Sequence, residues 1–162
     1  MRRSSLFAAL AALAVFASFA VVGTVLATHL PTNHNITTVL ARGTLAGPVK
    51  YNVDDIKVQT KAAVDVVTAD VTFGPLASAG WHKHPGPVFV VVQSGTISVW
   101  DESCVKHEYT VGDSFFEPGP AASLLVKNES ATTAVHLYAT FIVPVGTTVL
   151  RIGTAHLCGI EE

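Results

Sequence analysis

The chain has 162 residues, 14% of them charged, and a formal net charge of −2 at neutral pH. This length gives room for one domain. The balanced charge excludes nucleic acid as an expected partner, because binding to a polyanion requires clustered lysines and arginines.

The first 27 residues have the pattern of an export signal. Arg2 and Arg3 precede an uncharged apolar run over residues 6–27, and Val25-Leu26-Ala27 fits a cleavage site. The same run is long enough to cross a bilayer as an uncleaved anchor. The sequence therefore predicts a signal peptide or membrane anchor over residues 1–27, a linker over residues 28–42, and a domain outside the cytoplasm that meets the membrane only through this segment.

Residues 43–162 have the composition of an all-β domain. Short runs of β-branched and aromatic residues are separated by Gly, Pro and Asp-Asn turns, and no helical period appears. Strands are expected over residues 43–50, 56–59, 62–73, 82–95, 96–100, 107–111, 114–117, 123–126 and 133–143. The run Val88–Val92 is apolar on both faces, which predicts a buried strand. This number of strands favours a closed or two-sheet barrel that hides its edges.

Cys104 and Cys158 are the two cysteines of the chain. In an oxidising compartment an even pair predicts a disulfide, which here would tie the middle of the barrel to the C-terminal tail. Two unpaired thiols are the alternative.

A histidine pair, His82 and His84, lies in the stretch Gly80–Gly95. In an extended strand residues i and i+2 point to the same side, so the two imidazoles converge and provide half of a metal site. The alternative is a pair at the barrel rim that binds no metal.

The order of these motifs resembles the cupin superfamily, whose members are jelly-roll barrels of the double-stranded β-helix type. The first cupin motif contains His-x-His, then a glutamate and a glycine; His82, His84 and Gly95 match it, and Val88 stands at the glutamate position. In the second motif Gly112 and Pro118 match, and Ser123 stands at the histidine position.

The resemblance implies a site where three imidazoles and one carboxylate hold Fe, Mn, Ni, Zn or Cu. Two of these four positions are changed here, and zinc and iron sites normally need at least three protein ligands. A divalent metal is therefore expected to be weakly held or absent. His136, on the last long strand, is the candidate third ligand, whereas Glu117 is expected to be a solvated carboxylate at the Pro118 bend.

The candidate pocket contains apolar and polar residues near the histidine pair. They are Trp81, Val88, Val90, Phe115 and Ser123.

The sequence leaves three candidate functions. The first is an exported cupin that binds a small molecule near His82 and His84, and the second is a metal-dependent oxygenase or isomerase with a non-standard ligand set. The third is a homodimer that pairs through the strands of residues 43–73.

Overall fold

The computed structural model describes residues 35–160. The expected signal peptide or anchor, residues 1–27, and the first part of the expected linker lie outside the described residues. Within residues 35–160, no helix is long and apolar enough to span a membrane.

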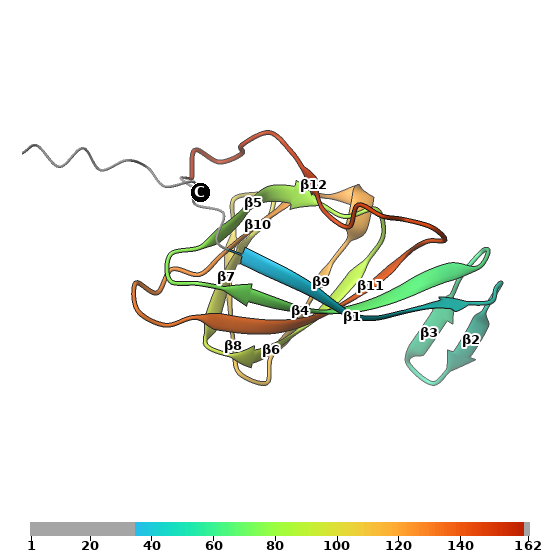
Figure 1. The fold of residues 1–162 in the computed structure, drawn as a ribbon. Helices are drawn as coiled ribbons and strands as arrows, with labels where there is room; N and C mark the ends of the chain where they lie inside the picture. Colours follow the sequence, from blue (N-terminus) through green and yellow to red (C-terminus); the bar gives the residue numbers. More distant parts are fainter. Residues whose placement is uncertain (1–34, 161–162) are drawn as a thin grey trace, which may run out of the picture.

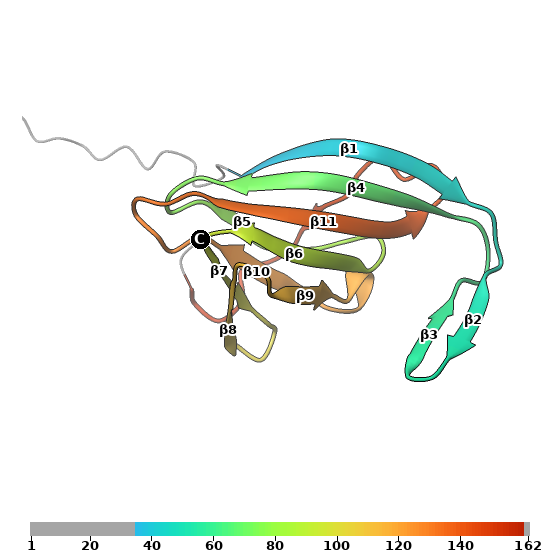
Figure 2. The ribbon, with the colours of Figure 1, turned by 90° about the horizontal axis from the view of Figure 1, so that it is seen from below.

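Two five-stranded antiparallel sheets face each other, and a separate hairpin extends from one end (Figures 1 and 2). The first sheet has the order β1 (Asn35–Leu45), β4 (Val64–Phe73), β11 (Val135–Pro144), β6 (Val88–Ser94) and β9 (Ser114–Glu117). The second has the order β12 (Ile152–Gly153), β5 (Ser78–Lys83), β10 (Leu124–Lys127), β7 (Thr96–Trp100) and β8 (Lys106–Thr110). The hairpin consists of β2 (Lys50–Val53) and β3 (Ile56–Gln59), and η1 (Gly119–Ala121) is a short 3-10 turn. The predicted all-β jelly roll is confirmed.

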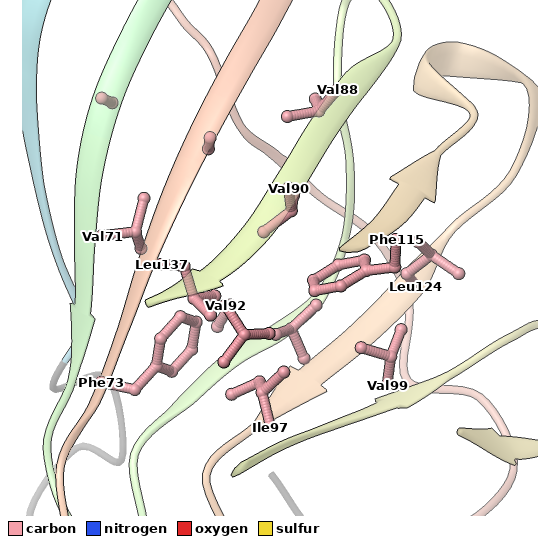
Figure 3. Packing of buried hydrophobic residues seen from close by; sticks show 14 of the residues in the cluster. Val71, Phe73, Val88, Val90, Val92, Ile97, Val99, Phe115, Leu124 and Leu137 are labelled. Atoms are coloured by element: carbon pink, nitrogen blue, oxygen red, sulfur yellow. The ribbon is translucent and has the colours of Figure 1, made fainter. Parts of the chain in front are cut away.

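Side-chain alternation along each strand builds the core between the sheets. In β4 every second residue from Asp65 to Phe73 is buried, as the sequence pattern predicts. Val88, Val90 and Val92 of β6 point into the same space (Figure 3). Because inward residues come from both sheets, they form one continuous apolar cluster.

Two expectations about individual strands are corrected. The histidine pair does not begin the strand of Val88–Val92: His82 belongs to β5 in the second sheet, and the chain crosses through Gly86-Pro87 before β6 begins in the first. Nor is β6 buried on both faces, because Phe89 and Val91 are 54% and 47% exposed.

The expected linker is also corrected from residue 35 onward. β1 begins at Asn35 and pairs with β4 along its whole length, with an irregularity next to Leu40. The β-branched residues Ile36, Thr37, Thr38 and Val39 suit this extended pairing. The barrel therefore starts before residue 43.

The C-terminal tail covers a second, smaller apolar cluster. Trp81, Trp100 and Leu125 are buried together, and Leu157, Cys158 and Ile160 of the tail pack against them. The predicted disulfide is confirmed: Cys104 and Cys158 are bonded, with their Cα atoms 5.6 Å apart. The bond and the apolar contacts together hold the tail on the second sheet.

Loss of this disulfide should destabilise the domain. The bond closes a loop with a sequence separation of 54 residues, and for a loop of this length the chain-entropy model gives a loss of roughly 3–4 kcal/mol in the free energy of unfolding. Urea denaturation of a Cys104→Ser, Cys158→Ser variant measures the loss. Dithiothreitol should destabilise the wild-type protein and leave the variant unchanged; equal stability of the two oxidised proteins would contradict the prediction.

Candidate metal centre

The two histidines converge, as the sequence predicts. His82 is near the end of β5 and His84 follows it by two residues, and their ring centroids are 4.8 Å apart. Both side chains are buried between the sheets, with the residues 4% and 6% exposed. Burial of two imidazoles on the inner side of the barrel makes them available to a ligand that enters it.

Each histidine is oriented by a backbone carbonyl. His82 Nδ1 lies 2.8 Å from Gly80 O, and His84 Nδ1 lies 2.5 Å from Leu150 O. A carbonyl only accepts, so each Nδ1 carries the hydrogen and donates it, and a neutral ring then keeps its lone pair on Nε2. Such outer hydrogen bonds are typical of histidines that ligate metals through the other nitrogen.

Glu117 supplies a carboxylate beside them. It is buried, 6% exposed, because it follows the inward-pointing Phe115 by two residues in β9 and therefore lies on the same face of the strand. Its cross-strand partner is Val88, and partners in antiparallel strands point to the same face. The expectation of a solvated Glu117 is therefore wrong. Its spacing of two residues from the apolar Phe115 is the sequence signal that places it on the inner face of the strand.

A close backbone contact brings Glu117 to His84. The turn after β9 places Gly119 against Gly86: a Cβ on Gly119 would lie 2.6 Å from the carbonyl carbon of Gly86, and Gly119 has a φ of +71°. Glycine permits both the close approach and the positive φ. His84 and Glu117, each two residues away from one of these glycines, therefore meet inside the barrel.

The three side chains form a compact donor set. His84 Nε2 lies 2.5 Å from Glu117 Oε2, and one ligand atom from each of His82, His84 and Glu117 lies within 4.8 Å of the others. Among the described residues, Glu117 Oε2 has no hydrogen-bond partner. Since an imidazole lone pair and a carboxylate oxygen repel each other, this contact requires a proton or a cation between them.

The donor set fits a divalent transition metal. Two imidazole nitrogens and one carboxylate oxygen suit Fe, Zn, Mn, Ni or Cu, and metal–ligand bonds of about 2.0–2.2 Å place two ligands of one ion up to roughly 4.4 Å apart. The ligand atoms of the three residues lie within 4.8 Å of one another, so only small side-chain shifts are needed for all three to bind one ion. The cluster thus provides three protein ligands and leaves coordination positions for other groups.

A cavity of about 150 Å³ adjoins the cluster. Its walls come from both sheets, and ten of its sixteen lining residues are apolar. The lining comprises Asn35, Thr37, Val71, Phe73, Ala79, His82, His84, Val88, Val90, Glu117, Val126, Leu137, Ala139, Phe141, Leu150 and Arg151.

Comparison with known proteins identifies the family. The cupin domain family model matches residues 69–141, which contain all three residues of the cluster. Residues 69–141 form a cupin domain. The resemblance of the histidine and glycine motifs to the cupin superfamily is therefore confirmed.

Solved structures resemble this cupin domain at low identity. A cupin domain from Bordetella pertussis Tohama I is 21% identical over 68% of this chain and 94% of its own, with a TM-score of 0.46. An RmlC-like cupin from Shewanella frigidimarina NCIMB 400 is 23% identical over 50% of this chain and 68% of its own, with a TM-score of 0.43. A DMSP lyase from Ruegeria pomeroyi DSS-3 is 13% identical over 55% of this chain, with a TM-score of 0.47, and the match spans 43% of the lyase. Among curated proteins no match was found.

In this cupin domain the carboxylate comes from a different strand than the family motif specifies. Val88, at the motif's glutamate position, is apolar and lines the cavity, and Glu117 is directly opposite it on β9. Ser123, at the histidine position, is buried, and its N–H donates to Glu102 Oε1 over 2.7 Å. Ser123 does not line the cavity, so the cluster has no third imidazole from this position.

His136 is not brought to the cluster. It alternates in β11 with the buried Val135 and Leu137 and shares the outer face with Tyr138. There its Nδ1 lies 3.2 Å from Thr72 Oγ1, whose residue is its cross-strand partner. Since successive strand residues point to opposite faces, His136 is directed away from the barrel interior.

Two further candidate pocket residues lie elsewhere, whereas Val88 and Val90 line the cavity as predicted. Trp81 precedes His82 in β5 and so points to the opposite face, where the C-terminal tail covers it. Phe115 is in the core and stacks on Tyr109, with ring centroids 4.7 Å apart.

Burial should make stability depend on pH through His82. Desolvation lowers the pKa of His82 below its usual 6.5, and the charge of Glu117 opposes this only in part. The unfolded chain binds a proton at this residue below about pH 6.5 and the folded chain resists it, so the free energy of unfolding should fall as pH decreases through that range.

Urea denaturation of metal-free protein between about pH 5.5 and 7.5 measures this dependence. A His82→Gln variant should show a shallower decline, and a His136→Gln variant should follow the wild type. Identical slopes for wild type and His82→Gln would contradict the prediction.

Proposed function

We propose that this protein is an exported cupin that binds a divalent transition metal through His82, His84 and Glu117 and holds a small molecule in the adjoining cavity. The single observation that carries the proposal is the buried cluster of two Nδ1-anchored imidazoles and a carboxylate, in which Glu117 Oε2 lies 2.5 Å from His84 Nε2. Export is supported by the disulfide, since such bonds persist in oxidising compartments.

A metal would account for features that a purely structural cluster leaves costly. A buried carboxylate oxygen that faces the lone pair of an imidazole nitrogen costs free energy, and a cation bound by both His84 and Glu117 removes that cost. The carbonyls of Gly80 and Leu150 hold the two rings in place before any ion arrives. Little reorganisation is then needed for binding.

Metal content tests the proposal. Purified protein dialysed against Zn²⁺ or Co²⁺ should retain about one equivalent, since three protein ligands suffice for a transition-metal site. His82→Ala, His84→Ala and Glu117→Gln should each weaken affinity by at least about 100-fold, the upper range for loss of an outer-shell partner. Isothermal titration calorimetry and elemental analysis provide the readouts.

The matched control is His136→Ala, which removes a histidine of the same barrel from its outer face. It should retain wild-type affinity. Less than about a tenth of an equivalent in the wild type, or equal affinity in wild type and Glu117→Gln, would overturn the metal site.

A metal-dependent enzyme is the second candidate function. Three protein ligands would leave coordination positions of a metal open, and all three ligands line the cavity. A bound metal would supply Lewis-acid or oxygen chemistry there. The carbonyls of Gly80 and Leu150 would orient the histidine ligands, and the apolar cavity walls would exclude water. The activity would be of the oxygenase or isomerase type.

We also propose that the protein forms a homodimer through the β2–β3 hairpin. The hairpin projects beyond the barrel (Figures 1 and 2). One of its faces is wholly apolar and between 46% and 64% exposed: Tyr51, Val53, Ile56 and Val58. An isolated two-stranded hairpin is marginal in water. The outer face of the first sheet also exposes Phe89 and Phe116. The apolar face of the hairpin can therefore pack against this apolar surface of a second copy.

Light scattering of purified protein tests the assembly. The variant Val53→Lys, Ile56→Glu places an ion pair on the apolar face at directly paired positions and should be a monomer. The control Asn52→Lys, Lys57→Glu changes a cross-strand pair on the polar face of the same hairpin and should remain a dimer. A monomeric wild type would refute this interface.

A further inference from the structure

The cavity contains one cationic side chain that the metal cluster does not use. Arg151, from the tail segment before β12, lines the cavity together with its neighbour Leu150. Its guanidinium Nη1 donates to Ala79 O on β5. A guanidinium has N–H donors in a rigid plane, so this contact helps to orient the group.

Charge in the cavity favours an anionic ligand. Among its lining residues, Arg151 and Glu117 carry opposite formal charges, and the two histidines are neutral when they bind metal. A divalent ion therefore leaves the site with a net positive charge in a space of low dielectric constant. An anion would neutralise that charge, whereas a cation would be repelled.

The cavity walls indicate the size and polarity of the rest of the ligand, apart from its anionic group. Ten of the sixteen lining residues are Val, Ala, Leu or Phe. The cavity volume of about 150 Å³ is close to that of apolar protein cavities of about 150 Å³ that accept benzene. A sugar or a dicarboxylate would leave polar groups unpaired against these walls. A small apolar body with one anionic group matches both size and polarity.

We propose that the ligand class of this site is a small monocarboxylate with an apolar aliphatic or aromatic body, and that Arg151 binds its carboxylate. This inference rests on the proposed metal site, since the carboxylate would lie between Arg151 and the metal. Guanidinium and carboxylate match each other in bidentate geometry. The apolar body would then lie against the valines of β6.

Arg151 lies beyond residues 69–141, which the cupin family model matches. Its position depends on the tail, which pairs with β5 at Ile152 and Gly153 and is bonded to the barrel through Cys158. The proposed specificity therefore belongs to the tail of this chain and not to the motifs shared by cupins.

Binding of carboxylates and their amides to the Co²⁺-loaded full chain tests the inference. Benzoate and isobutyrate are compared with benzamide and isobutyramide, by calorimetry and by the change in the Co²⁺ visible spectrum. The carboxylates should bind at least about 10-fold more tightly than the amides, as expected for hydrogen bonds between charged groups. Equal affinity of acid and amide would overturn the inference.

Arg151→Gln keeps an N–H donor for Ala79 but removes the charge, and should abolish the preference for the acid. Arg151→Lys should restore part of it. Lys83→Gln is the matched control, because Lys83 is on β5 but does not line the cavity; it should behave as the wild type. Unchanged preference in Arg151→Gln, with metal content equal to wild type, would also refute the role of Arg151.

The experiment separates failure of the two proposals. Absence of bound Co²⁺ in the wild type would overturn the metal site, and the same titrations would then be made on the metal-free protein. A preference for the acid that depends on Arg151 supports the carboxylate site there, and no preference overturns it. Bound Co²⁺ without any preference for the acid overturns the ligand class alone.

Discussion

The contact between the backbones of Gly86 and Gly119 is the constraint on which the site depends. These glycines lie just after His84 and just after the Pro118 bend, and no side chain fits between them. Their close approach brings Glu117, at the end of β9, next to His82 in β5 and to His84 just after it, although β5 belongs to the opposite sheet. A jelly roll brings both strands to one interior, but the close packing of two turns determines that the carboxylate reaches the imidazoles.

The C-terminal tail connects the stability of the barrel to the chemistry of its interior. On the outer face of the second sheet it buries Trp81 and Trp100 and is bonded to the barrel through Cys104. Before it reaches that face it provides the Leu150 carbonyl to His84 and lines the cavity with Arg151. The residues that tune the site are therefore held by contacts made on the other side of the sheet.

The cluster also illustrates how a cupin fold can keep a carboxylate donor in its interior when the glutamate of its sequence motif is replaced. Glu117 is the direct cross-strand partner of Val88, the motif position that carries the glutamate in the family. A carboxylate on either strand points to the same face, so the donor is kept although its position in the sequence moves by 29 residues. Function in such a fold has to be inferred from the site itself, since the fold is shared by many activities.

Much of the fold and two of the three donors were predictable from the sequence. Alternation along Val64–Phe73 identifies the buried face of a strand, the spacing of His82 and His84 makes two imidazoles converge, and two cysteines after a predicted export signal indicate a disulfide. These are local rules, in which one residue's neighbours in sequence determine where its side chain points. Only the tertiary structure decided that Glu117 lies against His84 and that Arg151 lines the cavity. Both depend on which segments face each other across the barrel, and strand alternation gives the face on which a residue lies without giving its partner across the barrel.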